Sequence, residues 1–369
     1  MTNKLNYRKY CTPYDSVKLN LMVLIVPYLF SFALILVYML LASSANQEYE
    51  EFLENNVVEK INLVFLQLVA LGLFFYFIKK QKINFKIACK LNKKISIKNM
   101  LLIVILGVLF VYLTSPFLEI FEQGLISIGV DLTSDVGLDF SNAFDIIFAI
   151  LFLGILPGFV EELIFRGVIL QGLRPYGKWF AILISALLFM LFHGNLQQTI
   201  YQFAYGVLAG YLVILTGSLW ASILIHIFNN VFIIMITVIN TASNSTGEYN
   251  DITFGFILTA IGFLVVLFIA IYYLSKFIKK NVNYENKIQT NTFENSEYEN
   301  VLQDLNYQLL YKDANVKDEI NTIKIHANDY IEPSEKLKIT EFRNNRPVRY
   351  LLWVGIIGAI LLVLLNSFS

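Results

Sequence analysis

Long apolar stretches separated by short polar segments run along most of the chain. A transmembrane helix needs about 20 mostly apolar residues, and stretches near this length predict nine spanning helices. The first eight lie at 19–42, 61–78, 100–114, 144–173, 179–193, 199–215, 219–239 and 253–274, and the ninth lies at 350–365. The predicted fold class is therefore all-α, a polytopic transmembrane bundle with an eight-helix core and a C-terminal ninth span.

The same pattern divides the chain into three parts. Residues 1–280 form the predicted transmembrane core, and 350–369 carry the last helix. Between them, 281–349 is a polar stretch rich in Asn, Glu, Lys and Tyr. Its mixed charge and low apolar density favour a cytosolic linker or small appendage over a compact domain. This tail is also the candidate site for a protein partner.

Composition supports a protein whose main solvent is lipid. Hydrophobic residues make up 57% of the chain and charged residues 15%, with a mean hydropathy of +0.61, whereas soluble proteins carry about 25% charge. The formal net charge is zero, and no glycine-rich phosphate-binding pattern occurs, so we expect the bilayer as a partner and no nucleic acid. The two cysteines, Cys11 and Cys89, lack the spacing of a zinc site or disulfide framework, and we expect them to be reduced and incidental.

Basic residues predict the orientation, because Lys and Arg in short loops stay on the cytoplasmic face. The N-terminal arm is basic, and eight lysines lie between residues 79 and 98. The first and third connections are acidic instead. We therefore expect a multi-pass cell-membrane protein with a cytoplasmic N-terminus. Its richness in Asn and Lys suggests an AT-rich bacterial genome.

The fourth span carries charged residues that a bilayer does not readily accept. Ionisable groups in a membrane cost several kcal/mol unless they are paired or wetted, so each is a functional hypothesis. Glu162 and Arg166 are four residues apart on one helix face, in the favourable order for an ion pair. Glu161 is rotated about 100° from Glu162 and has no partner on its own helix. Glu161 is the candidate for chemistry, whereas the pair could act in catalysis or only hold helices together.

Two of the three histidines, His193 and His226, fall within or at the end of predicted spans. A single membrane histidine is often only an interhelical hydrogen-bond partner, but together with an unpaired glutamate they suggest a site. His226 and Asn230 are four residues apart, so their side chains point into the same groove. Counting about 1.5 Å of rise per residue places these groups and Glu161 at roughly similar depths, provided that the fourth helix continues to Leu173.

These residues form three ordered motifs that resemble a known family. Glu161 to Arg166 matches EExxxR, Phe189 to His193 matches FxxxH, and His226 to Asn230 matches HxxxN. The trio resembles the CAAX protease and bacteriocin-processing group, also called the Abi or CPBP family of intramembrane proteases, which includes type II CAAX prenyl endopeptidases. The similarity covers about 146–239. The tail and the ninth span lie outside it.

The resemblance implies an intramembrane endopeptidase in which Glu161, assisted by His193, activates a water while His226 and Asn230 stabilise the oxyanion. A carboxylate in an apolar cavity is a suitable base near neutral pH, and His or Asn donors suit the developing oxyanion. The family is often called a metalloprotease, and Glu161, His193 and His226 could instead hold a zinc ion. We favour the metal-independent glutamate mechanism, and a zinc cofactor stays open. Because bacteria are not expected to prenylate proteins, a membrane-associated peptide or protein is the expected substrate.

Two other functions compete with the enzyme. A non-catalytic scaffold of the same fold could regulate a partner, such as a sensor kinase or a cell-envelope enzyme, through its tail. A proton-coupled carrier could use Glu161 and the histidines as a relay, but it predicts broken helices in two repeated halves, and the sequence shows none. A scaffold has no evident reason to keep an unpaired carboxylate in lipid, so the protease is the preferred hypothesis.

Overall fold

The computed structural model describes residues 7–44, 56–130, 138–243, 253–293 and 345–367. Within them the chain is helical and forms no strand, apart from one isolated bridge between Arg8 and Ile83. The elements are α1 Pro13–Ser44, α3 Asn56–Lys80, α4 Phe85–Ala88, α5 Ile97–Ser127, α6 Ala143–Ala149, η1 Ile150–Ile155, α7 Leu156–Glu162, η2 Leu163–Ile169, α8 Leu170–Leu173, η3 Arg174–Tyr176, α9 Lys178–Phe192, α10 Thr199–Thr216, α11 Trp220–Ala242, α12 Phe254–Phe293 and α16 Arg346–Ser367. The predicted all-α fold class is confirmed.

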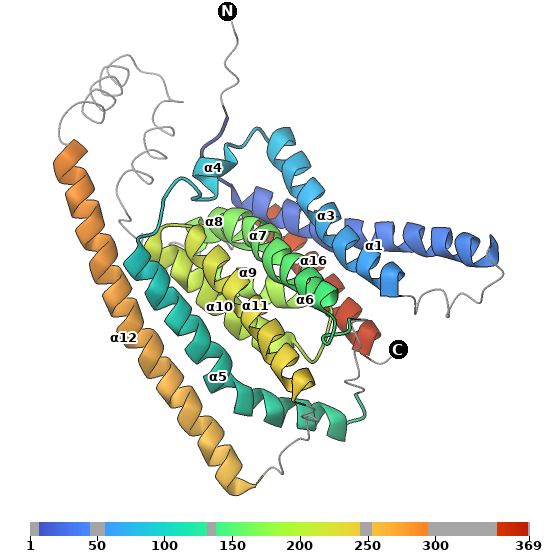
Figure 1. The fold of residues 1–369 in the computed structure, drawn as a ribbon. Helices are drawn as coiled ribbons and strands as arrows, with labels where there is room; N and C mark the ends of the chain where they lie inside the picture. The colour runs from blue at the N-terminus through green and yellow to red at the C-terminus, as the bar shows by residue number, and fades with distance from the viewer. Residues whose placement is uncertain (1–6, 45–55, 131–137, 244–252, 294–344, 368–369) are drawn as a thin grey trace, which may run out of the picture.

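The helices surround a central group formed by α7 to α11 (Figure 1). On one flank α12 lies along α5, which in turn packs against α11. On the other flank α1 packs against α3 and against α16, the helix at the far end of the chain. Many side chains on α12 and α1 are exposed apolar groups, such as Phe268 and Leu40. Such surfaces suit a lipid environment, where apolar side chains need no cover.

Seven helices of the described chain are long and apolar enough to cross a membrane. They are α1, α3 from Lys60, α5, the continuous stretch 143–176, α10, α11 and α12 as far as Asn283. The 15-residue helix α9 is apolar but shorter, and α16 is not among the seven. The multi-pass architecture is confirmed, while the predicted number of nine spans stays a prediction.

The third span is longer than the sequence predicts. The expected end was at residue 114, but α5 continues through Pro116 to Ser127. Proline lacks the N–H that would bond to the carbonyl four residues earlier, which normally interrupts a helix. Here the hydroxyl of Ser115 donates to that carbonyl, of Tyr112, at 2.9 Å. The lost bond is replaced locally, so the helix continues.

The helix α12 likewise extends beyond the predicted end of its span at residue 274. It runs to Phe293, so the first 13 residues of the predicted linker, 281–293, continue a helix rather than begin a separate segment. Hydropathy marks where a helix leaves the apolar layer, not where its hydrogen bonding stops. Residues 294–344, which hold most of the predicted appendage, lie outside the described residues. The polar stretch ends at α16, which starts at Arg346 instead of residue 350.

The fourth span is one continuous helical rod with two widened stretches. The π-helical segments η1 and η2 lie on either side of α7, which carries Glu161 and Glu162. Such i→i+5 turns occur mostly as short insertions in α-helices and often at functional sites. The continuation to Leu173, which the shared depth of the site residues required, is present.

Side chains from other helices bond to carbonyls of the widened stretches. In η2, the Ser185 hydroxyl of α9 donates to the carbonyl of Phe165 (2.8 Å), and the Ser16 hydroxyl of α1 donates to that of Ile169 (2.9 Å). In η1, the Asn230 amide of α11 donates to the carbonyl of Leu153 (3.1 Å). Because unsatisfied backbone groups are costly in a membrane, these bonds help the span to keep its irregular turns.

The two cysteines lie together and are both buried and free. A hydrogen bond with Cys11, together with burial, raises the pKa of the Cys89 thiol well above its usual value, so this thiol stays protonated. Cys89 also packs on Gly167 of η2, where an added Cβ would lie 3.0 Å from the Cys89 Cβ. The pair therefore joins the segment around α4 to the fourth span, a packing role that the sequence did not indicate.

Candidate active site

Glu162 is the centre of a fully buried charged group. Its Oε1 accepts hydrogen bonds from Arg166 Nη1 at 2.7 Å and from His226 Nδ1 at 2.8 Å. The side chains of Glu162 and Arg166 are both 0% exposed. The ion pair predicted from their spacing is present, and it also holds an imidazole of α11. Neither charged group is open to a substrate, so their geometry fits a positioning role.

Aromatic rings cover the arginine. The Arg166 guanidinium carbon lies 4.2 Å from the centre of the Phe189 ring and 5.8 Å from that of Tyr205. A guanidinium over an aromatic face is attracted by the negative face of the ring, and more strongly when water is excluded. Phe189 is also the first residue of the FxxxH motif, so this ring joins the second motif to the first.

Glu161 faces a different set of partners. Its Oε1 accepts a hydrogen bond from Gln67 Nε2 of α3 at 2.9 Å. Its Oε2 lies 3.9 Å from His193 Nε2 and 3.8 Å from His226 Nε2. These distances are too long for direct hydrogen bonds, and Oε2 is buried with no hydrogen-bond partner among the described residues. The structure therefore brings Glu161, His193 and His226 together around one unpartnered oxygen.

The hydrogen bonds at Nδ1 orient both imidazoles. His193 Nδ1 lies 2.9 Å from the carbonyl of Phe189, which can only accept. His226 Nδ1 meets the carboxylate of Glu162, which is paired with an arginine and also accepts. Each Nδ1 therefore carries a hydrogen, and in a neutral ring the lone pair lies on Nε2. Both lone pairs then face the Glu161 carboxylate.

This arrangement places one carboxylate oxygen and two imidazole nitrogens close to one another. Two hydrogen bonds of ordinary length, near 2.8 Å, easily bridge a separation of 3.8–3.9 Å through one water. His193 keeps 18% of its side chain exposed, whereas Glu161 and His226 keep only 5% and 4%. His193 is therefore the most exposed of the three side chains.

The third motif places its asparagine one helical turn from His226. Asn230 donates to the Leu153 carbonyl, and its Oδ1 accepts from Asn229 Nδ2 at 3.3 Å. Asn229 is itself buried and accepts a hydrogen bond from the hydroxyl of Tyr201. The amide of Asn230 is thus engaged with the backbone of η1. Its predicted oxyanion role stays a prediction.

Glu161, His193 and His226 have the right donor atoms for zinc, which binds carboxylate oxygen and imidazole nitrogen at about 2.0–2.2 Å. Within the described residues, however, no group of three or more His, Cys, Asp or Glu side chains is placed to hold a metal ion. The described side chains are thus not spaced as the ligands of a zinc centre.

Several residues around the site carry no motif signal. Gln67 is an uncharged polar residue within the predicted second span, far from the motifs in sequence, so only the folded arrangement reveals its bond to Glu161. Two tyrosines of α10 also belong to this group. Tyr201 donates a hydrogen bond to Asn229, and the ring of Tyr205 covers Arg166. The sequence could have pointed to Gln67 as a site residue only because it is polar within an apolar stretch. A neutral amide in such a stretch is weak evidence for a functional role.

Residues 143–232 match the family model for the type II CAAX prenyl endopeptidase Rce1-like proteins. The matched stretch contains Glu161, Glu162, Arg166, His193, His226 and Asn230, and the match confirms the resemblance to the CPBP family. It leaves most of the chain uncovered, including Gln67. No curated protein and no solved structure matches the chain.

Proposed function

We propose that this membrane protein, with its CAAX-protease-type segment 143–232, is an intramembrane endopeptidase. The observation that carries the proposal is the buried Oε2 of Glu161, which has no hydrogen-bond partner among the described residues and lies within 3.9 Å of the Nε2 atoms of His193 and His226. A buried acceptor without a donor is costly, and a water held there would satisfy it. Such a water would lie beside a general base, which is what peptide hydrolysis needs.

In the proposed reaction, Glu161 Oε2 removes a proton from this water while His193 Nε2 orients it. The hydroxide attacks the carbonyl carbon of the scissile peptide bond and forms a tetrahedral oxyanion. The C–N bond then breaks, and the protonated Glu161 gives its proton to the leaving amine. The carboxylate thereby returns to its starting state and can act as a base in the next turnover.

His226 is the proposed oxyanion donor. Its Nδ1 donates to Glu162, so Nε2 lies on the side of Glu161 Oε2. As an imidazolium the ring carries a hydrogen on Nε2 as well, and it can donate this hydrogen to a developing negative charge. Glu162 and Arg166 act through His226 and are positioning residues in this mechanism. Asn230 is also a positioning residue, because its amide holds the backbone of η1 at Leu153.

The proposed substrate is a membrane-associated peptide or protein in the cell membrane. Although the matched family is named for prenylated substrates, the substrate proposed for this chain carries no prenyl group. The partial exposure of His193 and the exposed apolar side chains of helices such as α1 and α12 support a substrate that approaches within the lipid layer.

The test compares membrane peptides from cells that carry the wild-type protein or Glu161→Gln. The matched control is Asp139→Asn, the same carboxylate-to-amide change at an exposed residue outside the site. We expect peptide products that appear with the wild type and with Asp139→Asn and disappear with Glu161→Gln. An unchanged set of products would contradict the proposal and favour the scaffold. Repeating the comparison with a chelator tests the metal-independent mechanism, which predicts the same products.

A further inference from the structure

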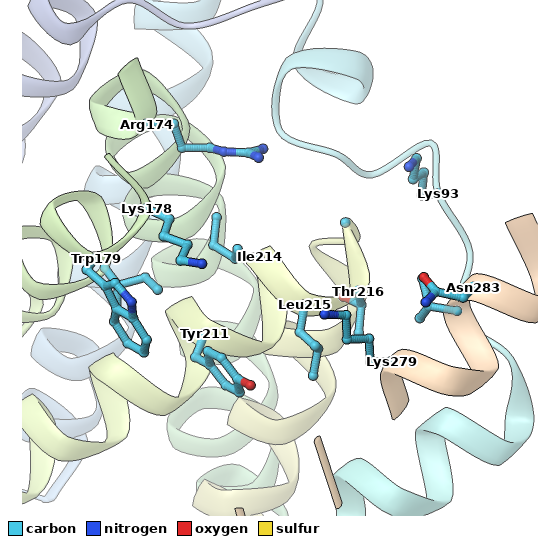
Figure 2. Close-up of a pocket in the computed structure, with 13 residues that line it drawn as sticks. Lys93, Arg174, Lys178, Trp179, Tyr211, Ile214, Leu215, Thr216, Lys279 and Asn283 are labelled. Carbon is cyan, nitrogen blue, oxygen red and sulfur yellow. The ribbon is translucent and has the colours of Figure 1, made fainter. Parts of the chain in front are cut away.

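A pocket lined by positive charge lies at the lysine-rich end of the bundle, separate from the candidate active site. Its volume is about 370 Å³. Four cationic side chains line it, Lys93, Arg174, Lys178 and Lys279, and none of the described residues in its lining is acidic. Figure 2 shows that these side chains come from separate segments around one space: the loop before α5, the junction of η3 with α9, and α12.

Hydrogen bonds to its backbone carbonyls hold the cationic loop in place. The carbonyls of Lys90, Leu91 and Lys93 accept from three successive residues, two just before α11 and one at its start. The donors are the Leu219 N–H at 3.1 Å, the Trp220 Nε1–H at 2.9 Å and the Ser218 hydroxyl. The ammonium of Lys93 then lies over Gly217, 3.3 Å from where a Cβ would stand. Gly217 ends α10 with a φ of +68°, a conformation that glycine adopts at little cost.

Local structure also affects the charges of Arg174 and Lys178. Arg174 Nη1 donates to Gln171 Oε1 at 3.2 Å, which directs the guanidinium. Lys178 is the first residue of α9, where the partial positive charge of the helix N-terminus adds to its own. Asn281, two residues after Lys279 on α12, donates to Asn99 at the start of α5 at 3.0 Å, which joins the two helices near Lys279. All four cationic side chains border the same pocket.

The rest of the lining is apolar and aromatic. Trp179 and Tyr211 stack with their ring centres 6.0 Å apart and their planes 6° from parallel, and Trp179 remains 47% exposed. Tryptophan and tyrosine concentrate at the level of lipid headgroups. Ile182, Ile214 and Val282 line the pocket as well. A ligand that fits would therefore carry a negative charge and an apolar part.

We propose that this pocket binds the phosphate-bearing headgroup of an anionic membrane phospholipid. The positive-inside rule predicts that the lysine-rich end of the bundle faces the cytoplasm, where anionic lipids attract basic groups. Basic pockets between transmembrane helices on that side are a recognised form of lipid site. A free phosphate shares the charge but not the apolar part, so the test separates the two sources. This proposal does not rest on the endopeptidase assignment.

The test uses the purified full-length protein in a neutral detergent and measures bound lipid by native mass spectrometry. The probes are dioctanoyl phosphatidylglycerol, dioctanoyl phosphatidylcholine and inorganic phosphate. Lys178→Gln/Lys279→Gln removes two charges from the pocket. The control Lys276→Gln/Lys280→Gln removes two exposed charges from the same end of α12 outside the pocket.

Each basic group near a membrane surface contributes about fivefold to the binding of anionic lipid, so the pocket variant should lose roughly 25-fold in affinity for phosphatidylglycerol. We expect less than a threefold loss for the control, and much weaker binding of phosphatidylcholine and phosphate to the wild type. An equal loss in both variants would overturn the proposal, because it would indicate general surface charge. Phosphate binding as tight as that of phosphatidylglycerol would overturn the lipid assignment. The single changes Lys279→Gln and Lys280→Gln, at adjacent residues, repeat the comparison if a double variant is poorly folded.

Discussion

The neighbouring glutamates Glu161 and Glu162 should both lose activity when changed to glutamine, but only the change at Glu162 should also lower stability. Both are buried, and both face histidines. Replacement by glutamine keeps the size and one acceptor oxygen of each side chain but removes its charge. Only Glu162 balances a buried cation, whereas only Glu161 has an oxygen that faces the proposed water. Glu161→Gln should therefore affect activity, and Glu162→Gln should affect stability as well.

The contacts indicate the size of each effect. Glu162→Gln leaves Arg166 without a counter-ion at 0% exposure, with its Nε and Nη2 already lacking hydrogen-bond partners among the described residues. Breaking a buried ion pair in this way costs about 3–5 kcal/mol of unfolding free energy. Glu161→Gln keeps the acceptor for Gln67 and buries a neutral group instead of a charge, so the change should stay within about 1 kcal/mol. Loss of the base should slow cleavage about 10²- to 10⁴-fold.

The assay combines two measurements on purified full-length protein. Unfolding free energy is measured in mixed micelles by titration with a denaturing detergent, followed by circular dichroism. Cleavage is followed in proteoliposomes by formation of the Glu161-dependent peptide product. We expect Glu161→Gln to be stable and inactive, Glu162→Gln to be unstable and inactive, and the control Asp139→Asn to resemble the wild type in both.

Two results would refute this reasoning. Wild-type stability of Glu162→Gln would mean that Arg166 does not depend on this carboxylate. Cleavage by Glu161→Gln at the wild-type rate would mean that another group activates the water. Equal destabilisation by both changes would likewise contradict the separate roles that the hydrogen bonds assign to the two residues.

Three further changes test how the site is held. Gln67→Leu should lower kcat about tenfold with little change in KM, because it removes the donor to Glu161 without touching a substrate; an unchanged kcat would exclude a positioning role. Gly158→Ala should cost about 1–3 kcal/mol of unfolding free energy, since the new Cβ would lie 2.6 Å from a side-chain carbon of Ile227, whereas Gly72→Ala, with open space around it, should be neutral or slightly stabilising. Asn230→Ala should cost about 1 kcal/mol and slow cleavage less than tenfold; a hundredfold loss at unchanged stability would assign its amide to the oxyanion instead.

The charged motifs were predictable because a bilayer makes ionisable residues conspicuous. Glu162 and Arg166 could be paired from their spacing alone, and the approach of His193 and His226 to Glu161 follows from their depths. Hydropathy located the spans but not their ends. It stopped α5 at the Thr-Ser-Pro sequence, where the Ser115 hydroxyl replaces the missing bond, and it stopped α12 where the helix becomes polar.

Long-range polar contacts were not predictable in this way. Gln67 lies 94 residues from Glu161, and a neutral amide within an apolar stretch does not indicate its partner. The widened turns of η1 and η2 also have no local signature, because their carbonyls are satisfied by Asn230, Ser185 and Ser16 from other helices. Contacts of this kind depend on the whole bundle rather than on a sequence window.

The widened stretch η2 changes the directions in which side chains point around the helix axis, so residues after it are rotated relative to those of a regular α-helix. A regular α-helix advances 100° per residue, and a π turn accommodates about one extra residue with little added rotation. Deleting one residue after Arg166 within η2 could thus return the backbone to α-helical bonding while Glu161 and Leu173 keep their orientations. The same deletion in the regular helix α9 would turn His193 away from the carboxylate. Length differences among relatives should therefore concentrate in the widened turns and be rare in α9.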